Sequence, residues 1–280
     1  MFRRGGRVRP VRPSGLDAAL AFALQDPVAN ALAGARLREV GHHPAVSQEF
    51  SSIGDEKEPS GLLWHGVNVS PLSATEEALD EFGRHVAARS RRASSVVGRR
   101  RAVETLWEPL ADVWGPAVRE YRWSQPLLVA GEAGSLGASR LRPALPEEEN
   151  AVFPAAVAMF REEVGIDPLL GDGGRSYRTR IKELIRLGRT YVVIEDGQVL
   201  FKADVGSLFG PVAQIHGVWV RPDHRGHGLG RTAMADLVRQ VRRDHAPQVS
   251  LYVNDFNEPA RRAYAASGFH QVGELSTILF

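Results

Sequence analysis

Residues 218–231 combine a short apolar run, a glycine-rich turn and the beginning of a helix, and read Val218-Trp219-Val220-Arg221-Pro222-Asp223-His224-Arg225-Gly226-His227-Gly228-Leu229-Gly230-Arg231. The three glycines remove the Cβ atoms that would keep a ligand away from the backbone. Successive N–H groups at the positive end of the following helix can then converge on an anion. The pattern predicts a phosphate site, and a glycine turn with a purely structural role fits the same residues.

Two well-known phosphate-binding patterns do not fit this turn. A Walker loop ends in Gly-Lys-Ser or Gly-Lys-Thr, and the turn has no such ending. The dinucleotide fingerprint G-x-G-x-x-G is also absent, because Gly226, Gly228 and Gly230 are spaced by two. The predicted site therefore belongs to a different class.

Composition limits the remaining classes. At roughly 150 residues per domain, a chain of 280 residues predicts two domains, and 43% hydrophobic with 24% charged residues is typical of a soluble globular protein. No apolar run approaches the ~18 residues of a spanning helix, and the basic start MFRRGGRVRPVRP has no apolar segment behind it. The absence of cysteine excludes disulfides, thiolate metal sites and a cysteine nucleophile. We expect a cytoplasmic protein without a membrane anchor or a bound metal.

The overall charge does not favour nucleic-acid binding, because the formal net charge is only +2. Two stretches depart from this balance: five arginines precede Ser14, and seven lie from Arg84 to Arg101, without an acidic residue in either stretch. Both fit phosphate-binding patches, or an Arg-rich RNA-binding surface. A disordered tail and a solvated helix face are the plainer explanation and the one we favour.

The chain divides into a disordered basic tail (1–13), an N-terminal accessory domain (14–130) and a C-terminal domain (138–280), with the boundary near Gly134 in the small-residue run GEAGSLG. In the first domain we predict two short helices within 16–37, helices at 74–88 and 103–114, and extended runs at 62–72 and 121–130. In the second we predict helices at 147–164, 177–187, 229–243 and 259–267, and strands at 190–194, 199–205, 214–220, 249–253 and 276–280. Asp196-Gly197 predicts a hairpin between the first two of these strands, and hence antiparallel pairing.

A second motif gives the turn a family context. Arg225-x-x-Gly228-x-Gly230 is followed about thirty residues later by Asn257-x-x-Ala260-x-x-x-Tyr264-x-x-x-Gly268-Phe269. Together they resemble the acyl-coenzyme-A site of the GNAT acyltransferase superfamily, and the resemblance covers about residues 138–280. It implies an α+β domain with a mostly antiparallel sheet flanked by helices. Strands 214–220 and 249–253 would splay apart into a slot for the cosubstrate acetyl-CoA.

The same resemblance assigns the residues that bind coenzyme A. The diphosphate would lie on the N–H groups of Arg225, Gly226, His227, Gly228, Leu229, Gly230 and Arg231. The pantetheine arm would pair with the strand at Val218, Trp219 and Val220 as an added strand does, and would be contacted by Asn254, Asn257, Ala260 and Tyr264. A plain structural role is open for two of these residues: Asn257 could cap the helix beside it, and Tyr264 could pack in the core.

The catalytic groups are less completely defined. The resemblance implies that Tyr264 protonates the leaving thiolate. Many relatives carry a glutamate base at the position of Gln214, which cannot accept a proton. His216, expected on the same strand face as Gln214, Val218 and Val220, has an ordinary pKa near 6.5 that suits a general base. Glu162 and Glu163 are alternative candidates for the base. His216 could instead have only a structural role, as a hydrogen-bonded histidine within the strand. If the amine arrives deprotonated, no base is needed.

Further runs are similar to actinobacterial GNAT proteins with an extra N-terminal domain; they include A-M-F-R-E-E-V-G (158–165), A-Q-I-H-G-V-W-V (213–220) and S-S-V-V-G (94–98). This resemblance implies that the smaller N-terminal α/β domain is an accessory, a degenerate GNAT-like lobe or lid. We expect an N-acetyltransferase (EC 2.3.1.-) that transfers acetyl directly to an unidentified primary amine in a ternary complex, as a monomer or homodimer. The alternative is a catalytically weak acyl-CoA sensor.

Overall fold

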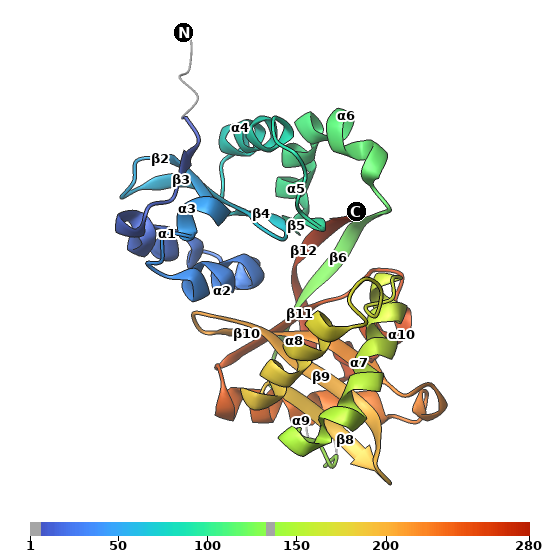
Figure 1. The fold of residues 1–280 in the computed structure, drawn as a ribbon. Helices are drawn as coiled ribbons and strands as arrows, with labels where there is room; N and C mark the ends of the chain where they lie inside the picture. The colour runs from blue at the N-terminus through green and yellow to red at the C-terminus, as the bar shows by residue number, and fades with distance from the viewer. Residues whose placement is uncertain (1–6, 133–137) are drawn as a thin grey trace. The chain divides into compact units, whose positions relative to one another are not determined.

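A computed structural model describes residues 7–132 and 138–280, and Figure 1 shows its ribbon. Contacts divide the chain into two compact units. The first holds Met1–Leu127, Tyr252–Phe256 and Gln271–Phe280, and the second holds Leu128–Leu251 and Asn257–His270. Two C-terminal segments therefore belong to the first unit. The predicted domain limits instead place all of residues 138–280 in the second domain. The predicted boundary at Gly134 lies outside the described residues.

The first unit is a mixed α/β unit built on one sheet. Its strands β1 to β5 follow one another in chain order, and β12 and β6 continue the sheet beyond β5. The strands are β1 (Arg9–Pro10), β2 (Phe50–Gly54), β3 (Pro59–His65), β4 (Val69–Leu72), β5 (Ser95–Arg99), β6 (Glu120–Ala130) and β12 (Phe269–Leu279). The helices are α1 (Leu16–Ala23), α2 (Ala31–Val40), α3 (Val46–Glu49), α4 (Glu76–Ala87), α5 (Arg100–Trp107) and α6 (Ala111–Trp114).

Helix α4 confirms the helix predicted at 74–88, and its sequence explains both ends. Thr75 caps it by accepting a hydrogen bond from Ala78 N at 3.3 Å. Glu76 and Glu77 lie in the first turn and Arg84 and His85 in the last, which suits the helix dipole. Its apolar face, including Phe82, is buried in the core of the unit.

Two predicted elements of this unit are interrupted in the structure. The run 62–72 is two antiparallel strands, β3 and β4, because Gly66-Val67-Asn68 turns the chain between them. The helix predicted at 103–114 is broken at Pro109, which separates α5 from α6 through a 3₁₀ turn (Glu108–Leu110). Strand β2 lies in a segment for which no strand was predicted.

The start of the described chain also differs from its prediction. Arg9 and Pro10 form β1, which pairs with Ser52 and Ser51 of β2, and Val11 N donates to Phe50 O at 2.9 Å. The prediction of a disordered tail over 1–13 is therefore wrong for these residues. Residues 1–6 lie outside the described part of the chain.

The arginine run from 84 to 101 is largely neutralised. Four of its members form ion pairs, namely Arg84–Asp80, Arg99–Asp26, Arg100–Glu104 and Arg101–Glu76. A phosphate-binding surface made of the whole run would need these guanidinium groups to leave their carboxylate partners. The run is therefore not a uniform basic surface, and only Arg89, Arg91 and Arg92 lack a carboxylate partner among the described residues.

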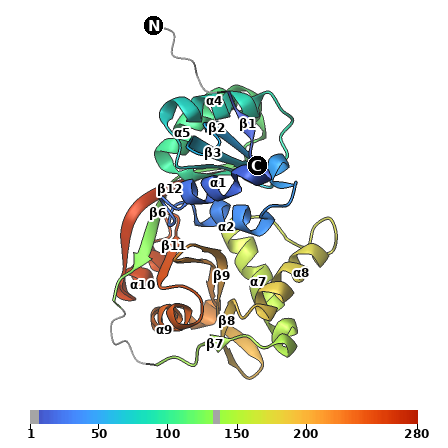
Figure 2. The same ribbon diagram turned by 90° about the vertical axis from the view of Figure 1, so that its left-hand side faces the viewer.

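The second unit has the sheet order β11-β10-β9-β8-β7, antiparallel except for the parallel pair β10 and β11. Its strands are β7 (Arg142–Pro143), β8 (Thr190–Glu195), β9 (Gln198–Phe209), β10 (Val212–Val220) and β11 (Gln248–Tyr252). Its helices are α7 (Glu149–Val164), α8 (Arg175–Arg186), α9 (Leu229–Asp244) and α10 (Glu258–Ala266). In Figure 2, α7 and α8 lie on one side of these strands and α9 and α10 on the other.

The hairpin predicted at Asp196-Gly197 is confirmed. Glu195 pairs with Gln198 across a turn in which Asp196 and Gly197 both have positive φ, at +50° and +74°. This turn makes β8 and β9 antiparallel and brings Thr190 opposite Asp204, in the part of the sheet where β10 also pairs with β9. None of the helices within 7–132 and 138–280 has the length and apolarity that crossing a bilayer requires.

Candidate active site

Strands β10 and β11 separate after a short common stretch, as predicted. They pair only at Val212–Gln248, Ala213–Val249 and Gln214–Ser250. Beyond Gln214, β10 continues to Val220 and its pairing among the described residues is with β9 alone. One edge of β10 is thereby left without a strand partner at Val218 and Val220, where an extended ligand could pair with the backbone.

The glycine turn follows directly after β10 and is built by left-handed backbone. After a 3₁₀ turn (Pro222–His224), Gly226 and Gly228 have φ of +80° and +85°, and Gly228 is the N-cap of α9. Thr232 N makes the first helical hydrogen bond, to Gly228 O at 3.1 Å. The N–H groups from Gly226 to Arg231 donate to no acceptor in the part of the chain that the structure describes. This row of unsatisfied donors at a helix N-terminus has the form of an anion site.

Glu162, at the end of α7, holds this turn to β10. Its Oε2 accepts from Arg225 Nη2 at 2.7 Å, and its Oε1 accepts from Trp219 Nε1 at 3.1 Å. Arg225 Nε also donates to Val220 O at 2.9 Å. Both carboxylate oxygens of Glu162 thus help to fix the glycine turn, a role that the sequence did not suggest. We call residues 226–231 the phosphate turn from here on, after the ligand predicted for it. The Arg225 side chain points back to the strand.

His216 lies at an irregular part of β10. Its Nε2 is 3.0 Å from Gln214 Oε1, and its ring packs against Gly206 of β9. Burial, together with the charge of Arg180, lowers the pKa of His216 to about 4. The expected value near 6.5 therefore does not hold, and the ring is neutral at neutral pH.

The strict alternation predicted for 214, 216, 218 and 220 is wrong, because β10 shifts register against β9 after Gln214 and again between His216 and Trp219. His216 pairs with Asp204 and Trp219 with Lys202, and these partners lie two residues apart on one face of β9. Gly217, with φ of +57°, absorbs the extra residue as a bulge.

An ion pair that the sequence analysis missed lies under this bulge. Lys202 is fully buried and its Nζ donates to Asp204 Oδ2, while Thr190 Oγ1 donates to Asp204 Oδ1 at 2.8 Å. A Cβ added to Gly217 would come within 3.2 Å of Asp204 Oδ2. The signal in the sequence was a lysine and an aspartate spaced by two in an otherwise apolar strand. Removing either partner of such a pair would leave the other charge buried without its counter-charge, which is strongly destabilising.

Tyr264 lies on the inner face of α10. Its ring is 5.9 Å from that of Phe269, and only 7% of the residue is exposed. Burial and the charge of Glu163 raise the pKa of Tyr264 above its usual value, so the phenol is protonated at neutral pH. No described residue accepts a hydrogen bond from its hydroxyl group. The phenol is therefore a protonated group on a largely buried ring.

The remaining predicted contacts have partners of their own. Asn257 caps α10 and accepts from Ala260 N at 3.2 Å, so the capping role predicted for it is confirmed. Asn254 belongs to the first unit and accepts from Gln125 Nε2 at 2.8 Å. Ser250 Oγ is buried and has no hydrogen-bond partner among the described residues. Ser250 lies opposite Gln214, the last paired position before β10 and β11 separate.

Within residues 7–132 and 138–280, no group of three or more histidine, aspartate or glutamate side chains is placed to hold a metal ion.

Comparison with known proteins agrees with this geometry. Residues 48–152 match the model of a domain of unknown function (DUF4081), and residues 171–269 match that of the acetyltransferase (GNAT) family. A mycothiol acetyltransferase of Thermobispora bispora is 38% identical over 60 residues, which cover 21% of this chain and 20% of that protein. The chain thus spans about a fifth of the length of the curated relatives it matches.

Two solved structures share the fold over nearly the whole chain. A GCN5-related N-acetyltransferase from Sphaerobacter thermophilus has a TM-score of 0.62 at 17% identity, with 99% of this chain and 96% of that one covered. A tandem GNAT protein from the clavulanic acid biosynthesis pathway has a TM-score of 0.55 at 14% identity, with 97% of both chains covered. The chain therefore shares the fold of these structures, and it is similar to the GNAT acetyltransferase family over residues 171–269 and to the DUF4081 domain over residues 48–152.

Proposed function

We propose that this chain is an N-acetyltransferase that moves an acetyl group from acetyl-CoA to a primary amine by direct attack in a ternary complex. The observation that carries the proposal is the row of unsatisfied N–H groups from Gly226 to Arg231, placed where β10 has left β11. A diphosphate needs such donors, and the free edge of β10 behind it suits the extended arm of coenzyme A.

The residues of the second unit divide the binding task. The N–H groups of the turn and the helix dipole of α9 would hold the diphosphate, with Glu162 and Arg225 fixing the turn. The backbone of Val218 and Val220 would pair with the pantetheine arm.

Acetyl-CoA supplies an acetyl group activated as a thioester. As the amine nitrogen bonds to the acetyl carbon and the carbon–sulfur bond breaks, the Tyr264 phenol donates its proton to the sulfur and regains one from solvent. The phenol carries its proton at neutral pH, and its raised pKa makes it a weak acid, so the proton moves only as negative charge develops on the sulfur. A backbone N–H of β10 aimed at the thioester carbonyl would stabilise the charge that develops on its oxygen.

The amine must also lose a proton. His216 is neutral and can accept one, but its pKa of about 4 makes it a weak base. We therefore propose that the amine arrives deprotonated and that His216, held by Gln214, receives its proton only during the attack. Glu162 holds the phosphate turn instead of acting as the base.

The weak base also favours a second candidate, a catalytically weak protein that binds acyl-CoA and signals its presence. Both candidates share the phosphate turn and differ in turnover. The relatives named mycothiol acetyltransferases align over about a fifth of their length, so they do not bring an acceptor to this chain. We propose that the DUF4081 domain is an accessory, GNAT-like lobe, since the tandem GNAT protein shares the fold of the whole chain.

The assay that tests transfer follows the thiol released from acetyl-CoA over a panel of primary amines. The protein has no cysteine, so a thiol reagent meets no background from the enzyme. We expect Tyr264→Phe to lower kcat by about 100-fold or more, the usual contribution of a general acid, while the Kd of coenzyme A stays within about threefold.

The matched control is Tyr121→Phe, which removes the hydroxyl of a partly exposed tyrosine in the first unit. Unchanged kcat in Tyr264→Phe contradicts the acid role. Tight binding of coenzyme A by the wild-type protein without transfer to any amine of the panel supports the sensor instead.

A further inference from the structure

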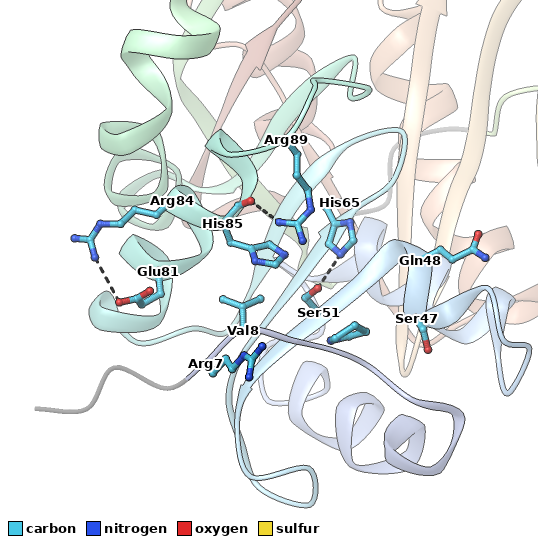
Figure 3. A pocket seen from close by; sticks show the side chains of 11 residues that line it. Arg7, Val8, Ser47, Gln48, Ser51, His65, Glu81, Arg84, His85 and Arg89 are labelled. Carbon is cyan, nitrogen blue, oxygen red and sulfur yellow. Dashed lines mark hydrogen bonds and ion pairs between the residues drawn. The ribbon is translucent and has the colours of Figure 1, made fainter.

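The first unit contains a cavity of about 680 Å³ that the proposed transfer does not use. Its walls come from β2, β3, α3, the C-terminal end of α4 and the segment that leads into β1. Figure 3 shows the side chains that line it. All of these residues belong to the first unit, whereas the phosphate turn of α9 belongs to the second. The cavity is therefore a separate place in the chain, and no comparison assigns a ligand to it.

Two guanidinium groups give the cavity its charge. Arg7 and Arg89 line it, and neither forms an ion pair with a carboxylate of the described residues. Arg89 Nη1 donates to His85 O at 2.5 Å, which ties the group to the end of α4. Arg84, by contrast, pairs with Asp80 and with Glu81, and Figure 3 shows it turned toward Glu81. Glu81, the acidic residue of the lining, is therefore neutralised by Arg84. The positive charges of Arg7 and Arg89 have no such partner among the described residues.

Neutral hydrogen-bonding groups lie beside these charges. Ser51 is 2% exposed, and its Oγ lies 2.9 Å from His65 Nε2. The rings of His65 and His85 meet edge to face with their centroids 6.4 Å apart. Burial lowers the pKa of His85 to about 4 and also lowers that of His65, with the charge of Arg89 acting in the same direction on both. Both rings are neutral at neutral pH, and each keeps an N–H to donate.

The backbone explains why these groups meet. Ser51 and His65 come from β2 and β3, which pair antiparallel with Ser51 opposite Leu63 and Phe50 opposite Trp64. Strand β1 pairs with the other edge of β2, Pro10 opposite Ser51, and this pairing carries Arg7 to the cavity. The basic segment that was predicted to be a disordered tail therefore forms one wall.

We propose that this cavity binds the phosphate group of a small phosphorylated molecule. Two guanidinium groups without a carboxylate partner and the ring N–H of His85, beside the hydrogen-bonded pair of Ser51 and His65, provide more donors than the two oxygens of a carboxylate can accept, whereas a phosphate group offers three terminal oxygens. The volume exceeds that of a phosphate ion and lies in the range of sites for small organic ligands. The remainder of the ligand would lie against Val8 and Gln48.

The test is a titration of the full chain with inorganic phosphate, and with acetate as the carboxylate probe, at constant pH and ionic strength. Histidine ring signals in NMR spectra report each place separately: His65 and His85 for the cavity, identified with His65→Gln and His85→Gln, and His227 for the phosphate turn. We expect phosphate to shift the His65 and His85 signals with a saturable dependence. Arg89→Gln and Arg7→Gln should each weaken that affinity about tenfold, the scale of a lost hydrogen bond to a charged group.

The matched control is Arg92→Gln, since Arg92 is exposed, belongs to the same arginine run and does not line the cavity. Its phosphate affinity should equal that of the wild type within about twofold. Equal affinity in Arg89→Gln and the wild type overturns the proposal. So does a shift of the His227 signal alone, or acetate binding as tightly as phosphate.

Discussion

At the residue scale, Glu162 shows how a family resemblance and a structure can assign different work to one side chain. The resemblance offered it as a base, whereas the structure has both of its oxygens accepting hydrogen bonds, from Arg225 and from Trp219. The Arg225–Glu162 pair is about half exposed, at 46% and 47% of the two side chains, so its strength is that of a surface ion pair. In the structure, these two hydrogen bonds tie the glycine turn to the end of β10.

The variant Glu162→Gln removes the charge and replaces one of the two accepting oxygens by an amide NH2 group, so only one of the two hydrogen bonds, from Arg225 or from Trp219, can be kept. We expect the KM for acetyl-CoA to rise about two- to fivefold, in line with the loss of a surface ion pair, and kcat to stay within about twofold. Steady-state kinetics check this, with Glu183→Gln as the control because Glu183 forms an exposed pair with Arg186 on α8. A fall in kcat of about 100-fold would restore Glu162 as the base.

At the scale of elements, the bulge at Gly217 connects the packing of the sheet to the site. It lies over the buried Lys202–Asp204 pair and ends the regular alternation of β10 just before Val218. A side chain there meets two penalties: φ of +57° is unfavourable for any residue with a Cβ, and the Cβ would come within 2.9 Å of Met159 Cε. The backbone therefore requires glycine, and an added Cβ would also displace the flexible end of Met159.

We expect Gly217→Ala to lower the free energy of unfolding by about 1–2 kcal/mol for the backbone, with a smaller further loss because Met159 and Asp204 must move away from the added Cβ. Gly188→Ala is the matched control, since its φ is +66° and nothing lies within 4 Å of the added Cβ. It should show only the backbone cost. Urea unfolding followed by circular dichroism measures both, and equal losses in the two variants would show that the space under the bulge is not tight.

At the scale of the whole molecule, local signals predicted the second unit well and the first unit less well. The hairpin at Asp196-Gly197, helix α9 and the separation of β10 from β11 follow from short-range patterns and from the family resemblance. The membership of Tyr252–Phe256 and Gln271–Phe280 in the first unit depends on contacts between distant parts of the chain, which periodicity does not report. The same is true of the Lys202–Asp204 pair, of the lowered pKa of His216 and of the cavity beside Arg89.

The measurement that tests the account most directly is calorimetric titration of the full chain with coenzyme A. The account predicts one-site binding to the wild type and a loss of affinity of about tenfold or more in the double variant Gly226→Ala/Gly228→Ala, because altered left-handed backbone at these positions misdirects the N–H groups. Gly197→Ala carries the same backbone penalty in a distant hairpin and should bind as the wild type does. No heat with the wild type, or equal affinity in a correctly folded double variant, would contradict the account.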